Sequence, residues 1–258
     1  MRIRNEREFP IGYTEIGAHH VETLMDFGIL RLRSGQAHRS KTPKERAFLL
    51  LTGSVEITWN GQKARASRSS LFDEAPWCLS LPAGAEATIS AVDGEAEISL
   101  HATENPRSFA AHLYTPEECR SEERGKGTMR ETSTRIVRTI IEDPKAASSN
   151  LVLGEVITLP GKWSSYPPHH HPQPEIYHYR FQPQNGFGLC SIGEDAYVLR
   201  NRDTVLIPAG AVHPQTAAPG YAMYYLWVIR HLDGARYGTP TFVPEHTWVT
   251  DPKADMWG

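Results

Sequence analysis

Hydrophobic and polar residues alternate in short segments along the first half of the chain, with turn-forming residues between them. Residues 55–59 alternate, Asn60-Gly61 follows, and residues 62–66 return in the opposite direction. Side chains of a strand face its two sides in turn, and Asn-Gly favours a tight type I′ turn, so this segment predicts a β-hairpin. We also predict a second hairpin, in which residues 87–92 and 96–100 are the strands and Asp93-Gly94 is the turn. Further strands are predicted at residues 28–32 and 47–51.

The second half of the chain repeats this pattern of short alternating segments. Residues 117–127, between the halves, are charged and lack apolar periodicity, which is typical of an exposed connection. No long amphipathic helix is indicated, and short helices are expected only near residues 116–123 or at the C-terminus. The pattern predicts an all-β fold, with further strands at residues 134–141, 151–159, 176–181, 186–191, 196–199, 204–207 and 223–229.

A short sequence repeat links the two halves. Residues 69–84 end in apolar-Pro82-Ala-Gly84, and residues 203–210 end in apolar-Pro208-Ala-Gly210. Two copies of one all-β unit is the economical interpretation, and chance agreement between two short segments is the alternative.

Composition and charge restrict the classes of protein to which the chain can belong. It is 40% hydrophobic and 22% charged, as in globular domains, and its net charge of −3 comes without a long basic run. Nucleic acid and anionic membranes are therefore not expected as partners. No apolar stretch approaches the ~18 residues that span a bilayer, and no secretory signal is evident. Three widely spaced cysteines fit reduced thiols, so we expect a cytoplasmic protein.

Two histidine motifs carry the candidate chemistry. His169 and His171 are two residues apart, so an extended chain points both imidazoles to one side, and Glu175 follows four residues later. His213 ends a Pro-x-Gly-x-x-His turn. A histidine pair alone is more often a surface feature, but three imidazoles and one carboxylate suit Zn, Mn, Fe, Ni or Co. We expect these four residues to bind a divalent metal ion, and His170 to point away from it.

The combination of His-x-His-x3-Glu with Pro-x-Gly-x-x-His resembles the two motifs of the cupin superfamily. More narrowly, the chain is similar to the 5-deoxy-glucuronate isomerase family of inositol catabolism, which is related to the 5-keto-4-deoxyuronate isomerases. The similarity is strong over residues 151–232 and looser at residues 45–53 and 72–76. The segments that carry the similarity are residues 163–169, 175–181, 184–188, 195–197 and 219–227.

The resemblance implies a bicupin, in which two antiparallel jelly-roll barrels follow one another. We expect a degenerate barrel and connection at residues 1–125 and a metal-binding barrel at residues 126–258. Carried over to this sequence, the family's metal ligands are His169, His171, Glu175 and His213. The first half has Glu45, but no histidine follows Pro82-Ala-Gly84, and His38 stands alone. We interpret it as a structural or dimerisation barrel, which leaves a homo-oligomer open.

The chain also departs from the family pattern. The segment between His171 and Glu175 is short, and the stretch between Gly188 and Asp195 is trimmed. His170 stands where relatives commonly have lysine. The loops at the rim of the site therefore differ from those of its relatives. The resemblance consequently says less about which sugar acid is the substrate than about the binding of a metal.

Strand alternation separates the candidate substrate-binding residues. Tyr177 and Tyr179 share the face of Glu175 and can bind sugar hydroxyls, with core packing as the alternative role, whereas His178 faces the other way. This argues against His178 as the catalytic base, and leaves Lys162 or metal-bound hydroxide, so the catalytic residue stays unassigned. Further candidates for substrate contact are Lys162, Gln215 and Tyr225, and for a carboxylate Lys162, Arg180 and Arg200.

The resulting hypothesis is a metal-dependent aldose–ketose isomerase that converts 5-deoxy-D-glucuronate to 5-dehydro-2-deoxy-D-gluconate, with zinc as the first expected metal. A cupin dioxygenase that uses Fe or Ni is the second interpretation, because the same ligand set serves oxygen chemistry. A non-catalytic cupin that binds a sugar acid is the third. Metal identity, oxygen consumption and turnover distinguish them.

Overall fold

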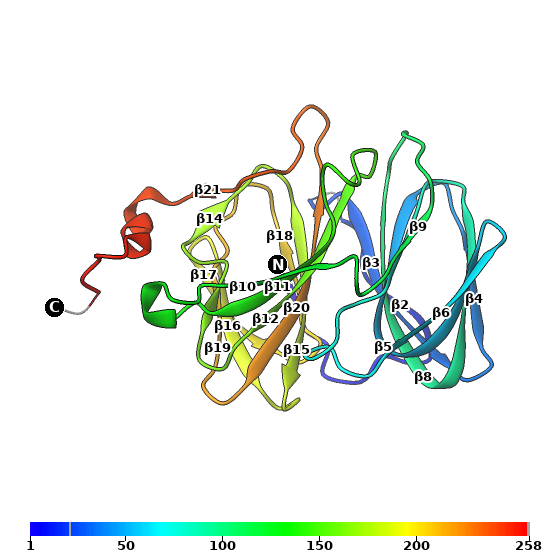
Figure 1. The fold of residues 1–258 in the computed structure, drawn as a ribbon, viewed down its shortest axis with the longest axis horizontal. Helices are drawn as coiled ribbons and strands as arrows, with labels where there is room; N and C mark the ends of the chain where they lie inside the picture. Colours follow the sequence, from blue (N-terminus) through cyan, green and yellow to red (C-terminus); the bar gives the residue numbers. More distant parts are fainter. Residues whose placement is uncertain (21, 257–258) are drawn as a thin grey trace. The chain divides into compact units, whose positions relative to one another are not determined.

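Strands dominate the structure, a computed structural model that describes residues 1–20 and 22–256 (Figure 1). The only helices in this described part are two short 3-10 helices, η1 (Met129–Glu131) and η2 (Pro244–Thr250). The chain divides into two compact units. The N-terminal unit is Arg7–Arg120 with Ile140–Val152, and the C-terminal unit is Met1–Glu6, Ser121–Thr139 and Leu153–Gly258. The expected predominance of β structure is confirmed.

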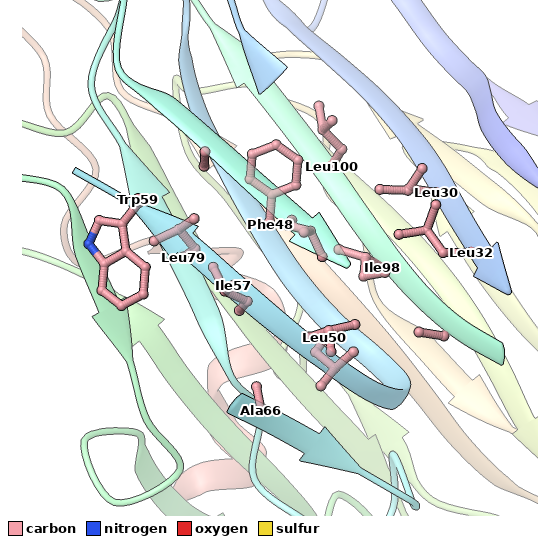
Figure 2. Close-up of a cluster of buried hydrophobic side chains, with 14 of the residues drawn as sticks. Leu30, Leu32, Phe48, Leu50, Ile57, Trp59, Ala66, Leu79, Ile98 and Leu100 are labelled. Atoms are coloured by element: carbon pink, nitrogen blue, oxygen red, sulfur yellow. The ribbon is translucent and has the colours of Figure 1, made fainter. Parts of the chain in front are cut away.

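One sheet builds the N-terminal unit, in the order β2-β3-β8-β5-β7-β9, with β4 paired to β8 and β6 paired to β5. Apolar side chains of β3, β5, β6, β7 and β8 form its core, and Figure 2 shows Phe48, Ile57 and Leu100 among them. The strands are β2 (Gly12–His20), β3 (Met25–Arg33), β4 (Ala37–Lys41), β5 (Glu45–Trp59), β6 (Gln62–Arg68), β7 (Cys78–Leu81), β8 (Glu86–Thr103) and β9 (His112–Tyr114).

The two predicted hairpins of this unit have different outcomes. β5 and β6 form the first, and both Asn60 (φ 45°) and Gly61 (φ 76°) take the positive φ of a type I′ turn. The second hairpin is wrong, because β8 continues through Asp93-Gly94 and pairs with β5 on both sides of it. The pairing shifts register there, so Asp93-Gly94 lies at a β-bulge instead of a turn.

The C-terminal unit contains a seven-stranded sheet of order β1-β18-β15-β20-β12-β11-β10, a four-stranded sheet of order β13-β19-β16-β17, and the pair β14-β21. Its core takes apolar side chains from both larger sheets, including Tyr179, Cys190 and Leu199. The strands are β1 (Arg2–Ile3), β10 (Arg120–Arg124), β11 (Arg135–Ile141), β12 (Leu151–Thr158), β13 (Trp163–Ser164), β14 (His169–His170), β15 (Glu175–Gln182), β16 (Phe187–Ile192), β17 (Asp195–Arg200), β18 (Thr204–Ile207), β19 (Gln215–Ala217), β20 (Ala222–Arg230) and β21 (Thr241–Phe242).

The strands predicted in the second half are confirmed, and the charged segment is exposed as expected, but part of it is a strand and not a connection. Residues 120–124 form β10 at the edge of the seven-stranded sheet, and most of its side chains are exposed. An edge strand is stabilised by backbone pairing on one side, so it needs no apolar periodicity. The expected C-terminal helix is η2, in the red segment of Figure 1, whereas residues 116–123 form no helix.

The short repeat corresponds to the same local structure in each unit. β7 and β18 each run into a Pro-Ala-Gly turn, and Gly84 and Gly210 share a φ of 77°. In each case the residue before the proline pairs with a residue near the start of a long strand. Ile207 pairs with Glu175, whereas Leu81 pairs with Arg46. The register therefore sets Arg46, and not Glu45, at the position equivalent to Glu175.

Glu45 faces the other side of β5 and belongs to a different arrangement. Its carboxylate accepts hydrogen bonds from Ser149 Oγ, from Asn150 N at 2.8 Å and from Asn105 Nδ2 at 2.6 Å. Arg46 is buried, and its Nη1 donates to Ser40 Oγ at 2.7 Å. The N-terminal unit thus has a fixed cation where the C-terminal unit has a carboxylate.

Two further expectations concern the thiols and the membrane. Cys78, Cys119 and Cys190 are all free, which confirms that they form no disulfide with one another. Among the described residues, none of the helices has the length and apolar character needed to cross a bilayer.

Candidate metal centre

Three of the four expected ligands meet in the interior of the C-terminal unit. His171, Glu175 and His213 are buried, and one ligand atom from each lies within 4.8 Å of the others. Glu175 Oε2 is 3.3 Å from His171 Nε2 and 3.3 Å from His213 Nε2. Gly210 N donates to His171 O at 2.9 Å and so ties the loop of the second motif to the loop of the first.

Backbone carbonyls fix which ring nitrogen of each histidine carries a hydrogen. The Nδ1 atoms of His169, His171 and His213 lie 3.1, 2.9 and 2.8 Å from the carbonyl oxygens of Pro167, Gln173 and Ala211. A carbonyl can only accept, so each Nδ1 carries a hydrogen and Nε2 is the nitrogen that can offer a lone pair to a metal ion. A backbone carbonyl on the outer nitrogen is the usual arrangement around a metal-binding histidine.

The donor set fits a divalent cation. His213 Nε2 is buried and has no hydrogen-bond partner among the described residues. It faces the Glu175 carboxylate, as does His171 Nε2, so two lone pairs and an anion point at one place. Burial lowers the pKa of His213 below its usual value, which keeps the ring neutral at pH 7. A metal ion satisfies all three groups at once.

His169 lies beside this cluster but outside it. It is half-buried on β14, and its ring centroid is 5.0 Å from that of His213 and 5.7 Å from that of Phe242 on β21. Burial lowers the pKa of His169 to about 4, so this imidazole is also neutral at pH 7. His170 is not part of the three-residue cluster.

A cavity opens next to the cluster, and its lining combines aromatic and apolar side chains with polar and charged ones. Glu175 is the only carboxylate among the described residues that line it. The lining consists of Val137, Val156, Tyr177, Tyr225, Trp227, Ile229, Tyr237, Ser164, Ser165, Arg124, Arg135, His169, His171 and Glu175.

The expected substrate-binding residues divide into three groups. Tyr177 and Tyr225 line the cavity. Tyr179 and Gln215 lie outside that lining but are linked to it, because Tyr179 OH donates to Gln215 Oε1 at 2.7 Å and Gln215 Nε2 donates to Ser165 Oγ at 3.3 Å. Lys162 does not line the cavity, and its backbone instead pairs with residues of β19.

The cavity's phenols are hydrogen-bond donors at neutral pH. Burial raises the pKa of Tyr225 and of Tyr237 to about 12, and that of Tyr177 well above its usual value. Tyr225 OH lies 2.5 Å from Ser164 Oγ, and Tyr177 OH lies 3.4 Å from Ser165 Oγ. None of these hydroxyls can act as a base near pH 7.

The predicted alternation along β15 is confirmed. Tyr177 and Tyr179 pack in the core, whereas His178 Nδ1 lies 2.8 Å from Thr204 Oγ1 and His178 Nε2 accepts from Arg180 on the opposite face. Neither His178 nor Arg180 reaches the cavity. Arg200 also lies elsewhere, with its guanidinium 5.1 Å from the Phe187 ring centroid.

The sequence interpretation missed two arginines that line the cavity. Arg135 precedes Val137 by two residues on β11, and alternation puts both on one face, so the apolar core position of Val137 could have identified it. Arg124 lies on β10 in the charged segment, where no periodicity indicates which side faces inward.

Comparison with known proteins supplies independent information about the chain. A sequence model described as the KduI/IolB family matches residues 4–249. Proteins named 5-deoxy-glucuronate isomerase from Geobacillus thermodenitrificans and Geobacillus kaustophilus are 30% and 31% identical to the chain over 246 residues. Each alignment covers 88% of this chain and 86% of the relative.

Solved structures show the same relationship at the level of the fold. An IolB-like protein from Salmonella typhimurium LT2 has a TM-score of 0.86 at 25% identity, covering 96% of this chain and 98% of that one. A point mutant of Bacillus subtilis oxalate decarboxylase has a TM-score of 0.68 at 12% identity, covering 94% and 79%. A cupin 2 conserved barrel domain protein from Leptotrichia buccalis has a TM-score of 0.53 at 15% identity, covering 89% and 96%. The last two show only that the fold is cupin-like.

Proposed function

The chain belongs to the KduI/IolB family and is an isomerase, and we propose that it converts 5-deoxy-D-glucuronate to 5-dehydro-2-deoxy-D-gluconate with a bound divalent metal ion. The relatives that carry this activity in their name align over most of both chains. The observation that carries the proposal is the cluster of His171, Glu175 and His213, of which His171 and Glu175 line a cavity with protonated phenols.

The proposed metal ligands are His171, Glu175 and His213, with His169 on β14 as the fourth. Three imidazoles and one carboxylate favour zinc as the first expected metal, with Mn, Fe, Ni and Co as alternatives. When bound, the cation would polarise the substrate carbonyl and stabilise negative charge on its oxygen.

The chain's own residues contribute orientation and hydrogen bonds. Tyr177 and Tyr225 can donate to substrate oxygens, because their raised pKa values keep them protonated. Ser164 and Ser165 hold these hydroxyls in place from β13 and the turn after it. The apolar wall of Val137, Val156 and Ile229 excludes water from the reacting end of the sugar.

We further propose that each compact unit is one barrel of a two-barrel cupin, and that only the C-terminal one binds metal. The equivalence of Arg46 and Glu175 supports this, because a buried guanidinium at the carboxylate position repels a cation. His38 in the same unit has a lowered pKa, caused first by burial and then by the charge of Arg46.

The test of the proposed function is a turnover assay with metal-analysed protein. NMR under anaerobic conditions should show loss of the aldehyde of 5-deoxy-D-glucuronate and formation of the ketone product. No turnover at full metal occupancy would contradict the proposal. Turnover that requires and consumes oxygen would instead favour a dioxygenase, and tight sugar-acid binding without turnover a binding protein.

A further inference from the structure

Arg135 presents an unusual charge to the cavity. Its Nη1 donates to Ser133 O at 2.7 Å and to Ser133 Oγ at 2.8 Å, and its Nη2 lies 3.5 Å from Tyr166 O. All these acceptors are neutral, and no carboxylate among the described residues pairs with it. Burial lowers its pKa, but a guanidinium stays charged at any physiological pH. The hydrogen bonds to Ser133 and Tyr166 therefore hold the Arg135 guanidinium in place, but no negative charge of a described residue neutralises it.

A second arginine reaches the same cavity. Arg124 pairs with Glu122, its Nη2 lying 2.8 Å from Glu122 Oε2, and both side chains remain largely exposed. An exposed pair of this kind contributes little energy and can exchange partners. The described lining thus holds two guanidinium groups and one carboxylate, and that carboxylate belongs to the metal cluster. A divalent cation there makes the cavity more positive still, so it favours an anionic ligand.

Tyr177 and Tyr225 line the same cavity as the two arginines and two residues of the metal cluster. The ring centroids of Tyr177 and Tyr225 are 4.7 Å apart, and Tyr177 also packs 5.8 Å from the His213 ring. A ligand with a carbonyl at one end and an anionic group at the other can therefore contact both sites along the tyrosines.

We propose that Arg135, assisted by Arg124, binds the carboxylate of the substrate and makes the enzyme specific for sugar acids over neutral sugars. The planar fork of arginine matches a carboxylate with two parallel hydrogen bonds. The inference rests on the proposed function, because it uses the carbonyl–carboxylate arrangement of a uronic acid. Arg135 and Arg124 take the place of the carboxylate-binding candidates from the sequence, Lys162, Arg180 and Arg200, none of which lines the cavity.

A matched pair of unreactive ligands tests the inference without turnover. D-Gluconate and D-glucitol are both linear six-carbon polyols, and only the first has a carboxylate. Calorimetric titration of metal-loaded wild-type protein should give a dissociation constant about 10- to 100-fold lower for gluconate, the range expected for charge-assisted hydrogen bonds. The same titration of metal-free protein should retain a preference, because the arginines remain.

Three variants assign the preference to residues. Arg135→Gln should reduce it about tenfold or more, and Arg135→Lys should restore only part, because lysine keeps the charge but not the fork. Arg124→Gln lies on an exposed edge strand and should lower the preference by a smaller factor without affecting folding. Arg200→Gln removes an arginine of the same unit that contacts Phe187, and should leave the preference unchanged.

The outcomes separate this inference from the proposed function. A gluconate preference that survives in both Arg135→Gln and Arg124→Gln, or that disappears on metal removal alone, overturns the carboxylate site and assigns the carboxylate to the metal. An arginine-dependent preference in a protein that does not isomerise 5-deoxy-D-glucuronate supports the site and contradicts the proposed reaction. If Arg135→Gln fails to fold, the Arg124→Gln and Arg135→Lys titrations still decide between these outcomes.

Discussion

At the scale of single residues, the histidines and the glutamate could be predicted because their motifs are local. His171 and Glu175 lie four residues apart, and the turn at Gly210 aims His213, so spacing alone identifies them. The cavity's arginines could not be found this way. Arg135 precedes the first motif by more than thirty residues, and it reaches the cavity only because β11 lies in the same sheet as β15.

The first prediction concerns the ligands. His213→Ala should lose at least about nine-tenths of the bound metal, because it removes one of the three buried ligand atoms of the cluster. His170→Ala, outside the cluster, should keep the wild-type metal content. Plasma emission spectrometry on dialysed protein measures both, and stoichiometric metal in His213→Ala would place the site elsewhere.

A buried histidine in the N-terminal unit gives a pH prediction. His101 is fully buried, its Nδ1 has no hydrogen-bond partner among the described residues, and burial lowers its pKa to about 3. Below about pH 6.5 the unfolded chain therefore binds a proton that the folded chain refuses, and stability falls as the pH falls toward 3. The slope is at most about 1.4 kcal/mol per pH unit.

Urea unfolding between pH 7 and pH 4 measures this slope. His101→Gln cannot take up the proton, so its free energy of unfolding should fall less steeply over the same range than that of the wild type. His112→Gln, at an exposed position beside Glu118, is the control. Equal slopes for His101→Gln and the wild type would show that His101 does not cause the acid sensitivity.

At the scale of elements, most strands could be predicted, and the errors have a common physical origin. Asp93-Gly94 has the sequence of a hairpin turn, but β5 pairs with β8 on both sides of it, so the dipeptide lies at a bulge. β10 looked like a connection because an edge strand with exposed faces has no apolar period. In both cases long-range pairing overrides the local signal.

The bulge leads to a prediction about Gly53. Its φ is 100°, and a Cβ there would lie 2.4 Å from Glu95 O and 2.6 Å from Ala96 Cα. Gly53→Ala should therefore destabilise the protein by about 2–4 kcal/mol, through strained backbone and a clash with backbone atoms. Gly61→Ala is the matched control, because it also has a positive φ (76°) but no atom within 4 Å.

Denaturant unfolding of the two glycine variants separates conformational strain from the clash. Gly61→Ala should cost about 1 kcal/mol, the penalty for positive φ alone. If both variants lose the same stability, the close approach of β5 and β8 at the bulge is not what makes glycine necessary at residue 53.

At the scale of the whole molecule, the repeat predicted two related units, but not where they differ. The two units differ in the charge of the residue that pairs with the position before the Pro-Ala-Gly turn. This residue is Glu175 in the C-terminal unit and Arg46 in the N-terminal unit. The one-residue offset between Glu45 and Arg46 decides which side chain faces inward, and no local pattern in the sequence reveals it. We therefore propose that metal binding is confined to the C-terminal unit.

Metal removal should accordingly affect the two units unequally. Hydrogen exchange measured by mass spectrometry should show faster exchange after chelation in residues 163–175 and 207–217, which hold the two ligand loops together. Residues 45–59 and 86–103 of the N-terminal unit should exchange at unchanged rates. Comparable loss of protection in both units would mean that the metal is not confined to the C-terminal one.

The most direct test of the account is to titrate zinc into metal-stripped protein and follow isomerisation of 5-deoxy-D-glucuronate. We expect activity to rise linearly and to level off at one metal ion per chain, with no rise in the His213→Ala variant. Full activity in stripped protein that contains less than about a tenth of an equivalent of any divalent metal would contradict the account.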